Sequence, residues 1–211
     1  MEKQIEVEFI GDIKKEQFDN LKVFFKKEGT YKKTKHRISF MYFKDKIPKD
    51  MSEIKLEDID LRLRITNKKP ELVLKQGLFT GAHARKEISI NLSLEEFPVY
   101  IELLKALGWH LGVIYAVETL VYNYKNIEFS LVNIKDYGYN FEAEILTDEK
   151  EQAEAKKKIM GVLDQLKLKP FDEAGLNKQC NDINNRKELQ FDFSKQSFDT
   201  IKNKFKEYFE E

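Results

Sequence analysis

The chain has 211 residues, with 37 basic and 37 acidic side chains, so its formal net charge is zero. This length supports one buried core, or one domain with a short appendage, and the charge balance argues against non-specific binding to duplex nucleic acid. The single cysteine, Cys180, excludes a disulfide framework and any metal site that needs paired cysteines in one chain. Neither a long apolar stretch nor an apolar leader is visible, so we expect a cytoplasmic protein that does not enter a membrane.

The spacing of apolar residues predicts an antiparallel α+β chain. In chain order, it predicts a strand over 4–10, a helix over 13–28, strands over 36–43, 59–66, 71–76 and 85–92, a helix over 94–107, strands over 114–124, 127–134 and 139–146, and helices over 148–168 and 195–210. Ser93 and Glu96 have the spacing of a capping box before the second helix. Lys125 and Asn126 are typical of a tight hairpin turn. Strands follow one another without alternating helices, which excludes a βαβ arrangement.

The chain divides into three parts by composition. Residues 1–170 are predicted to form one domain, within which the charged stretch 44–58 is interpreted as a loop. Residues 171–193 contain a glycine and an Asn-rich run and are interpreted as a connector. Residues 194–211 carry aromatic residues at helical spacing, which predicts an amphipathic terminal helix packed on the domain.

Ionisable residues recur two positions apart on the polar faces of the predicted strands. These pairs are Glu6/Glu8, Arg62/Arg64, Arg85/Glu87 and Glu142/Glu144, joined by Lys75. Because side chains alternate along a strand, the members of each pair share one face. A closed barrel with a polar interior would hold such a surface, whereas the simpler alternative is a solvated sheet face with cross-strand salt bridges.

Arginine is rare in this chain, and three of its five arginines lie between residues 62 and 85. A planar, always-charged guanidinium is suited to phosphate oxygens, and carboxylates hold the divalent metals that accompany polyphosphates. We therefore predict a polyphosphate site with Mg²⁺ or Mn²⁺. Its phosphate-binding residues are predicted to be Arg62, Arg64, Lys75 and Arg85, and its metal ligands Glu6, Glu8, Glu87, Glu142 and Glu144.

These residues, in this order and spacing, resemble the CYTH superfamily, the triphosphate tunnel metalloenzymes. The motifs are Glu6-x-Glu8, Leu61-Arg62-Leu63-Arg64, Lys75, Arg85-x-Glu87 and Gly138-x-x-Phe141-Glu142-x-Glu144. The branch of class IV adenylyl cyclases and thiamine-triphosphatases is the most similar, and the resemblance extends over about residues 4–170. It implies a closed antiparallel eight-stranded β-barrel with flanking helices. It also implies a triphosphatase or cyclase that acts on a nucleoside triphosphate, thiamine triphosphate or tripolyphosphate.

Several positions differ from the family pattern. Ile10 stands where the family has a lysine, Val117 and Thr119 where it has a Lys-x-Arg pair, and Val132 where it has an aspartate. The acidic set is therefore kept while part of the basic set is missing. Lys33, Lys35 and Lys86 are the candidates to replace it.

Two alternatives to an enzyme therefore stay open. The first is a catalytically impaired binding module for a phosphorylated ligand. The second is a scaffold whose terminal helix docks a partner. A homodimer is also left open.

Overall fold

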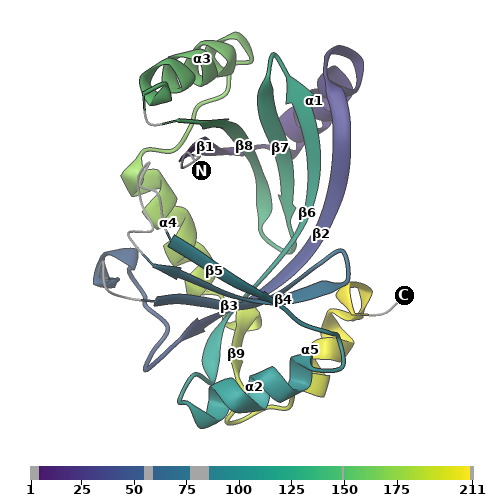
Figure 1. Cartoon of the computed structure of the whole chain (residues 1–211), viewed down its shortest axis with the longest axis vertical. Coiled ribbons are helices and arrows are strands. Elements are labelled where there is room, and N and C mark those ends of the chain that lie inside the picture. The colour runs from purple at the N-terminus through teal and green to yellow at the C-terminus, as the bar shows by residue number, and fades with distance from the viewer. Residues whose placement is uncertain (1–4, 55–58, 77–85, 149, 210–211) are drawn as a thin grey trace. The chain divides into compact units, whose positions relative to one another are not determined.

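The computed structural model describes residues 5–54, 59–76, 86–148 and 150–209 (Figure 1). Its elements are β1 (Ile5–Ile13), α1 (Lys15–Glu28), β2 (Thr30–Phe43), η1 (Met51–Glu53), β3 (Ile59–Thr66), β4 (Lys69–Gln76), β5 (Lys86–Asn91), α2 (Phe97–Ala106), β6 (Leu111–Tyr124), β7 (Ile127–Ile134), β8 (Gly138–Thr147), α3 (Gln152–Gln165), α4 (Glu173–Asn184), η2 (Lys187–Leu189), β9 (Gln190–Asp192), α5 (Phe198–Lys204) and η3 (Lys206–Tyr208). Among the described residues, no helix is both long and apolar enough to cross a membrane.

The local signals in the sequence correspond to observed turns and caps. Lys125 and Asn126 have φ angles of 53° and 59°, the left-handed pair that a two-residue hairpin requires between β6 and β7. At the start of α2, the Ser93 backbone N–H donates to Glu96 Oε2 at 2.8 Å, and the Glu96 N–H donates to Ser93 Oγ at 3.2 Å. Both predicted signals are confirmed.

In the described residues, the strands form one antiparallel sheet in the order β1-β8-β7-β6-β2-β3-β4-β5, with β9 paired to β6 (Figure 1). The predicted α+β class and the antiparallel sheet with flanking helices are therefore confirmed. The closed barrel is not confirmed, because hydrogen bonds do not join the two end strands, β1 and β5, in the part of the chain that is described.

The segment 171–193, interpreted from its composition as a connector, is a structured part of the chain. It contains α4, η2 and β9. Its Asn-rich run makes hydrogen bonds to the backbone of the loop that follows β2. The Met51 N–H donates to Asn181 Oδ1 at 2.7 Å, and Asn184 Nδ2 donates to the Pro48 carbonyl at 3.2 Å. The composition suggested a linker because it cannot show that these amides have backbone partners elsewhere in the chain.

The chain divides into two compact units. The described residues of unit 1 lie within Met1–Lys35 and Val117–Leu176, and those of unit 2 within His36–Phe79, Arg85–Ala116 and Asn177–Glu211. In unit 1, α1 and α3 cover one face of the sheet and bury Phe25, Phe129 and Phe141 completely. The opposite face of these strands carries Glu6, Glu8, Glu128, Glu142 and Glu144.

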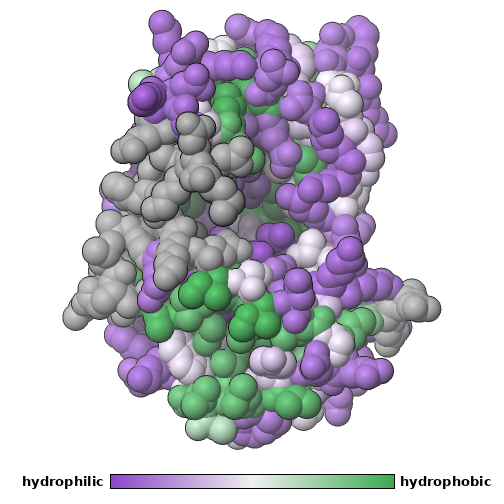
Figure 2. Space-filling model, viewed as in Figure 1, coloured by the Kyte–Doolittle hydropathy of each residue, from purple (hydrophilic) through white to green (hydrophobic). Residues whose placement is uncertain are grey.

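Unit 2 has its own aromatic core around Phe40 on β2. The ring of Phe40 lies 5.7 Å from that of Phe97 on α2 and 5.6 Å from that of Phe191 on β9. Phe205, which follows α5, is fully buried in the same core. Three apolar residues are exposed on α2 and at its C-cap: Val99, Leu103 and Leu107, at 65%, 50% and 62% exposure (Figure 2).

Candidate functional site

Three glutamates lie side by side on the face of the unit 1 strands that is opposite α1 and α3. Glu8 on β1 is in register with Glu144 on β8, and Glu144 is in register with Glu128 on β7. Directly opposed residues of antiparallel strands share a face, with Cβ atoms about 4.5–5.5 Å apart. Like charges at this spacing repel, so this carboxylate row needs a proton or a cation to be stable.

Two glutamates of this row, together with Glu6, have a geometry that fits a divalent metal. Glu6, Glu8 and Glu144 each offer a carboxylate oxygen, and these oxygens all lie within 4.8 Å of one another. Glu6 and Glu8 are exposed and Glu144 is partly buried. Carboxylate oxygens that converge at the edge of solvent are the ligands that Mg²⁺ and Mn²⁺ prefer. These three predicted residues are therefore brought together by the fold.

Glu144 is the residue of this row whose pKa is shifted most clearly. Burial raises the pKa of its carboxyl to about 8, aided by a hydrogen bond with Glu6 and by the charges of Glu6 and Glu128. The charge of Lys35 lowers this pKa and so acts in the opposite direction. At neutral pH Glu144 is therefore largely protonated, and a metal ion that binds it must displace that proton.

The rest of this face is much less polar. Ile10 lies opposite Glu142, and Glu142 lies opposite Ser130. Thr119 lies opposite Val132, and both are buried, at 6% and 2% exposure. The positions that depart from the family pattern therefore lie on the same face as the predicted metal ligands. On the two strands beside it, Glu142 is in register with the uncharged residues Ile10 and Ser130.

Two of the predicted arginines, Arg62 and Arg64, lie in unit 2 on β3, and each has a carboxylate partner. Arg62 Nε and Nη2 donate to the two oxygens of Asp60 at 2.7 and 2.6 Å. Arg62 and Asp60 are only 16% and 19% exposed. Asp60 is also in register with Lys75 on β4, so two predicted cations flank one carboxylate.

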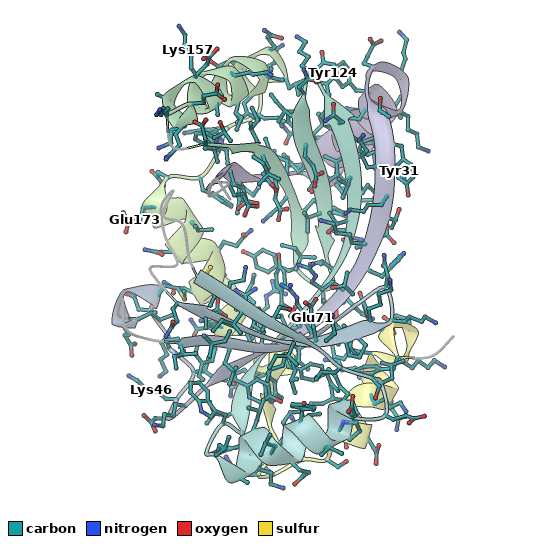
Figure 3. The ribbon with its side chains drawn as sticks, in the orientation of Figure 1. Tyr31, Lys46, Glu71, Tyr124, Lys157 and Glu173 are labelled. Atoms are coloured by element: carbon teal, nitrogen blue, oxygen red, sulfur yellow. The ribbon has the colours of Figure 1, made fainter. Side chains whose placement is uncertain are left out.

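Arg64 is held in the same way by Glu71 on β4, which is labelled in Figure 3. Its Nε and Nη2 donate to Glu71 Oε1 and Oε2 at 2.6 and 3.1 Å, and Ser89 Oγ donates to Glu71 Oε2 at 2.8 Å. Burial by itself would raise the pKa of Glu71. The hydrogen bonds from Arg64 and Ser89, and the charges of Arg64 and Arg37, outweigh it and lower that pKa. Glu71 is therefore ionised at neutral pH.

The fold places the predicted residues in two groups. Glu6, Glu8, Glu142 and Glu144 lie in unit 1, and Arg62, Arg64 and Lys75 in unit 2. Arg85 and the side chain of Glu87 lie outside the described residues.

The sequence reasoning missed three carboxylates, Asp60, Glu71 and Glu128. The alternation of side chains along a strand was enough to predict that Asp60 and Glu71 lie on the same face as the predicted cations. Asp60 shares a face with Arg62, two positions away, and Glu71 shares a face with Lys75, four positions away. Glu128 could not be found in this way, because its role depends on the register between β7 and β8.

Comparisons with solved structures show the fold. A protein from Pyrococcus horikoshii, PH1819, is 22% identical with a TM-score of 0.62, covering 82% of this chain and 99% of that one. A "putative adenylate cyclase" from Vibrio parahaemolyticus is 17% identical with a TM-score of 0.55, covering 80% and 94%. A "putative adenylyl cyclase" from Hippeastrum, described as having a dominant triphosphatase activity, is 15% identical with a TM-score of 0.55, covering 84% and 96%.

No family model and no curated protein sequence matches the chain. The family resemblance is thus confirmed at the level of structure. The chain shares its fold with these putative adenylate cyclases and with the Hippeastrum protein, as the resemblance predicted.

Proposed function

We propose that this protein binds a triphosphate-containing substrate together with Mg²⁺ or Mn²⁺ and cleaves it, by hydrolysis or by cyclisation. The observation that carries the proposal is the convergence of Glu6, Glu8 and Glu144 oxygens within 4.8 Å. The similarity in fold to a cyclase-like protein with triphosphatase activity supports it. Closure of the sheet into a tunnel is the finer structural part of the same proposal. The alternative of a binding module without turnover gains no support from these neighbours.

In this proposal the carboxylates and the arginines have different tasks. Glu6, Glu8 and Glu144 hold the metal, which when bound neutralises charge on the phosphate oxygens and acts as a Lewis acid. Arg62 and Arg64 bind phosphate oxygens through charge-assisted hydrogen bonds. Asp60 and Glu71 fix the orientation of these guanidinium groups, because each accepts from both Nε and Nη2.

The test is turnover of tripolyphosphate, thiamine triphosphate and ATP with Mg²⁺ or Mn²⁺ and with EDTA. Orthophosphate release identifies hydrolysis, and formation of cyclic AMP with pyrophosphate identifies cyclisation. Glu8→Gln and Glu144→Gln are expected to lower the rate by about 100-fold or more, because each removes a proposed metal ligand. Glu154→Gln, a change at an exposed position on α3, is the matched control. Turnover that survives EDTA, or that persists in both ligand variants, would contradict the proposal.

A further inference from the structure

The acidic face of unit 1 lacks a cation on its own four strands. On the described parts of β1, β8, β7 and β6, the residues that share this face include the glutamates of the row together with Ile10, Glu142, Ser130 and Val121. No lysine, arginine or histidine is among them in these described segments. A phosphate that approaches this face with one divalent ion therefore still meets an excess of negative charge.

We propose that Lys35, on the neighbouring strand β2, supplies the phosphate-binding cation of this face. This inference rests on the proposed function and names one more residue of the same site. Lys35 supplies the positive charge that the first strand does not supply, because its position 10 is an isoleucine.

The alternation along β2 places Lys35 on the polar side of the sheet. Arg37 and Ser39 are in register with Thr66 and Arg64, so these two residues of β2 share the face of the β3 arginines. Ile38 and Phe40, which alternate with them, lie in the core. Lys35 lies two positions before Arg37 and so continues the face of Arg37, and β2 is the strand next to β6 in the sheet.

Burial and charge distinguish Lys35 from the other lysines at this end of β2. Lys32 and Lys33 are exposed, whereas Lys35 is partly buried. The charge of Lys35 acts on Glu144, where it opposes the effects of burial and of Glu6. Its ammonium group therefore lies within electrostatic reach of the carboxylate row.

A lysine is chemically suited to this position. Its ammonium is a compact charge on a flexible stem, which binds a phosphate oxygen without requiring a fixed two-pronged geometry. The same charge disfavours a metal ion on its own, because two cations near the row repel each other. Removal of the charge should therefore weaken polyphosphate binding without weakening the binding of a metal ion alone.

The experiment measures metal binding and polyphosphate binding by calorimetry on the full chain. The first titration uses Mn²⁺ alone, and the second adds imidotriphosphate, a tripolyphosphate analogue that resists hydrolysis, to Mn²⁺-saturated protein. Lys35→Gln is expected to weaken imidotriphosphate binding by about tenfold or more, which is the loss of one charge-assisted hydrogen bond. Binding of Mn²⁺ alone should be unchanged or tighter. A residue with a merely structural role would not weaken one and spare the other.

Two further variants make the test specific. Lys26→Gln, a change at an exposed position on α1, is the matched control and should leave both affinities unchanged. Adding Ile10→Lys to Lys35→Gln should restore imidotriphosphate binding, because position 10 lies opposite Glu142 on the acidic face. If the parent protein binds imidotriphosphate and Lys35→Gln binds it equally well, the inference about Lys35 is wrong and the proposed function stands. If the parent protein does not bind imidotriphosphate with Mn²⁺, both are wrong.

Discussion

The polar faces of the two units both carry carboxylates, but the partners of these carboxylates differ. In unit 2, Glu71 accepts hydrogen bonds from Arg64 and Ser89, and its pKa is lowered. In unit 1, Glu144 lies between two other glutamates, and its pKa is raised to about 8. Both side chains are partly buried. Burial alone therefore does not decide their charge, and the partner across the neighbouring strand does.

This difference separates a preorganised region from one that needs a ligand. The arginines of unit 2 are held in place by carboxylates of the protein, so their orientation does not depend on a substrate. The glutamates of unit 1 repel one another until a proton or metal ion neutralises them. Three changes test this comparison, ordered by the expected change in the free energy of unfolding at a fixed pH or, for the pH dependence, per pH unit.

The largest effect is expected when a partner is removed in unit 2. Arg64→Met leaves the ionised Glu71, 18% exposed, without its bidentate partner. We expect the free energy of unfolding at pH 7 to fall by about 2–3 kcal/mol, somewhat less than for a fully buried pair. Urea unfolding measures this loss. The double variant Arg64→Met/Glu71→Gln should recover most of it, and no recovery would show that the loss came from packing rather than from a stranded charge.

The second effect is a pH dependence of stability that arises in unit 1. With a pKa of about 8, Glu144 holds a proton in the folded chain that the unfolded chain releases near its ordinary value of about 4.3. The free energy of unfolding in EDTA should therefore fall as pH rises between these values, by at most about 1.4 kcal/mol per pH unit from this group. Glu144→Gln should show a shallower fall over the same range. An identical slope in both proteins would show that Glu144 does not carry the raised pKa.

The smallest effect is expected from relief of the repulsion between Glu128 and Glu144. Glu128→Gln removes one of two like charges on directly opposed positions and should raise the free energy of unfolding at pH 8.5 by about 0.5 kcal/mol. It should also lower the pKa of Glu144, which NMR titration of the side-chain carboxyl can follow. The exposed Glu154→Gln on α3 is the control for a simple loss of one surface charge. A destabilised Glu128→Gln would mean that Glu128 has a favourable partner instead.

Much of the fold could be predicted because the strands alternate regularly. The ranges 59–66 and 127–134 coincide with β3 and β7, and the hairpin at Lys125 and Asn126 forms as expected. The segment that contains α4 and β9 was missed, because its order depends on distant partners. Gly112 illustrates this dependence: a Cβ there would lie 2.0 Å from the Met41 carbonyl oxygen and 2.7 Å from Phe191.

The candidate site could be predicted residue by residue but not as a set of contacts. Period-two spacing is enough to place Glu6 with Glu8, or Arg62 with Arg64, on one face. Which carboxylate meets which cation depends on register, and register is decided by the whole sheet. For that reason the sequence could not show that Glu71 holds Arg64.

The two longest strands have a consequence for how this protein can be cut or rearranged. Both β2 and β6, of 14 residues each, begin in one unit and end in the other. Neither unit is a continuous segment of chain, so a truncation at a unit boundary removes half of a paired strand. New chain termini are better placed at a surface turn such as Lys125-Asn126, where the strands on either side remain whole.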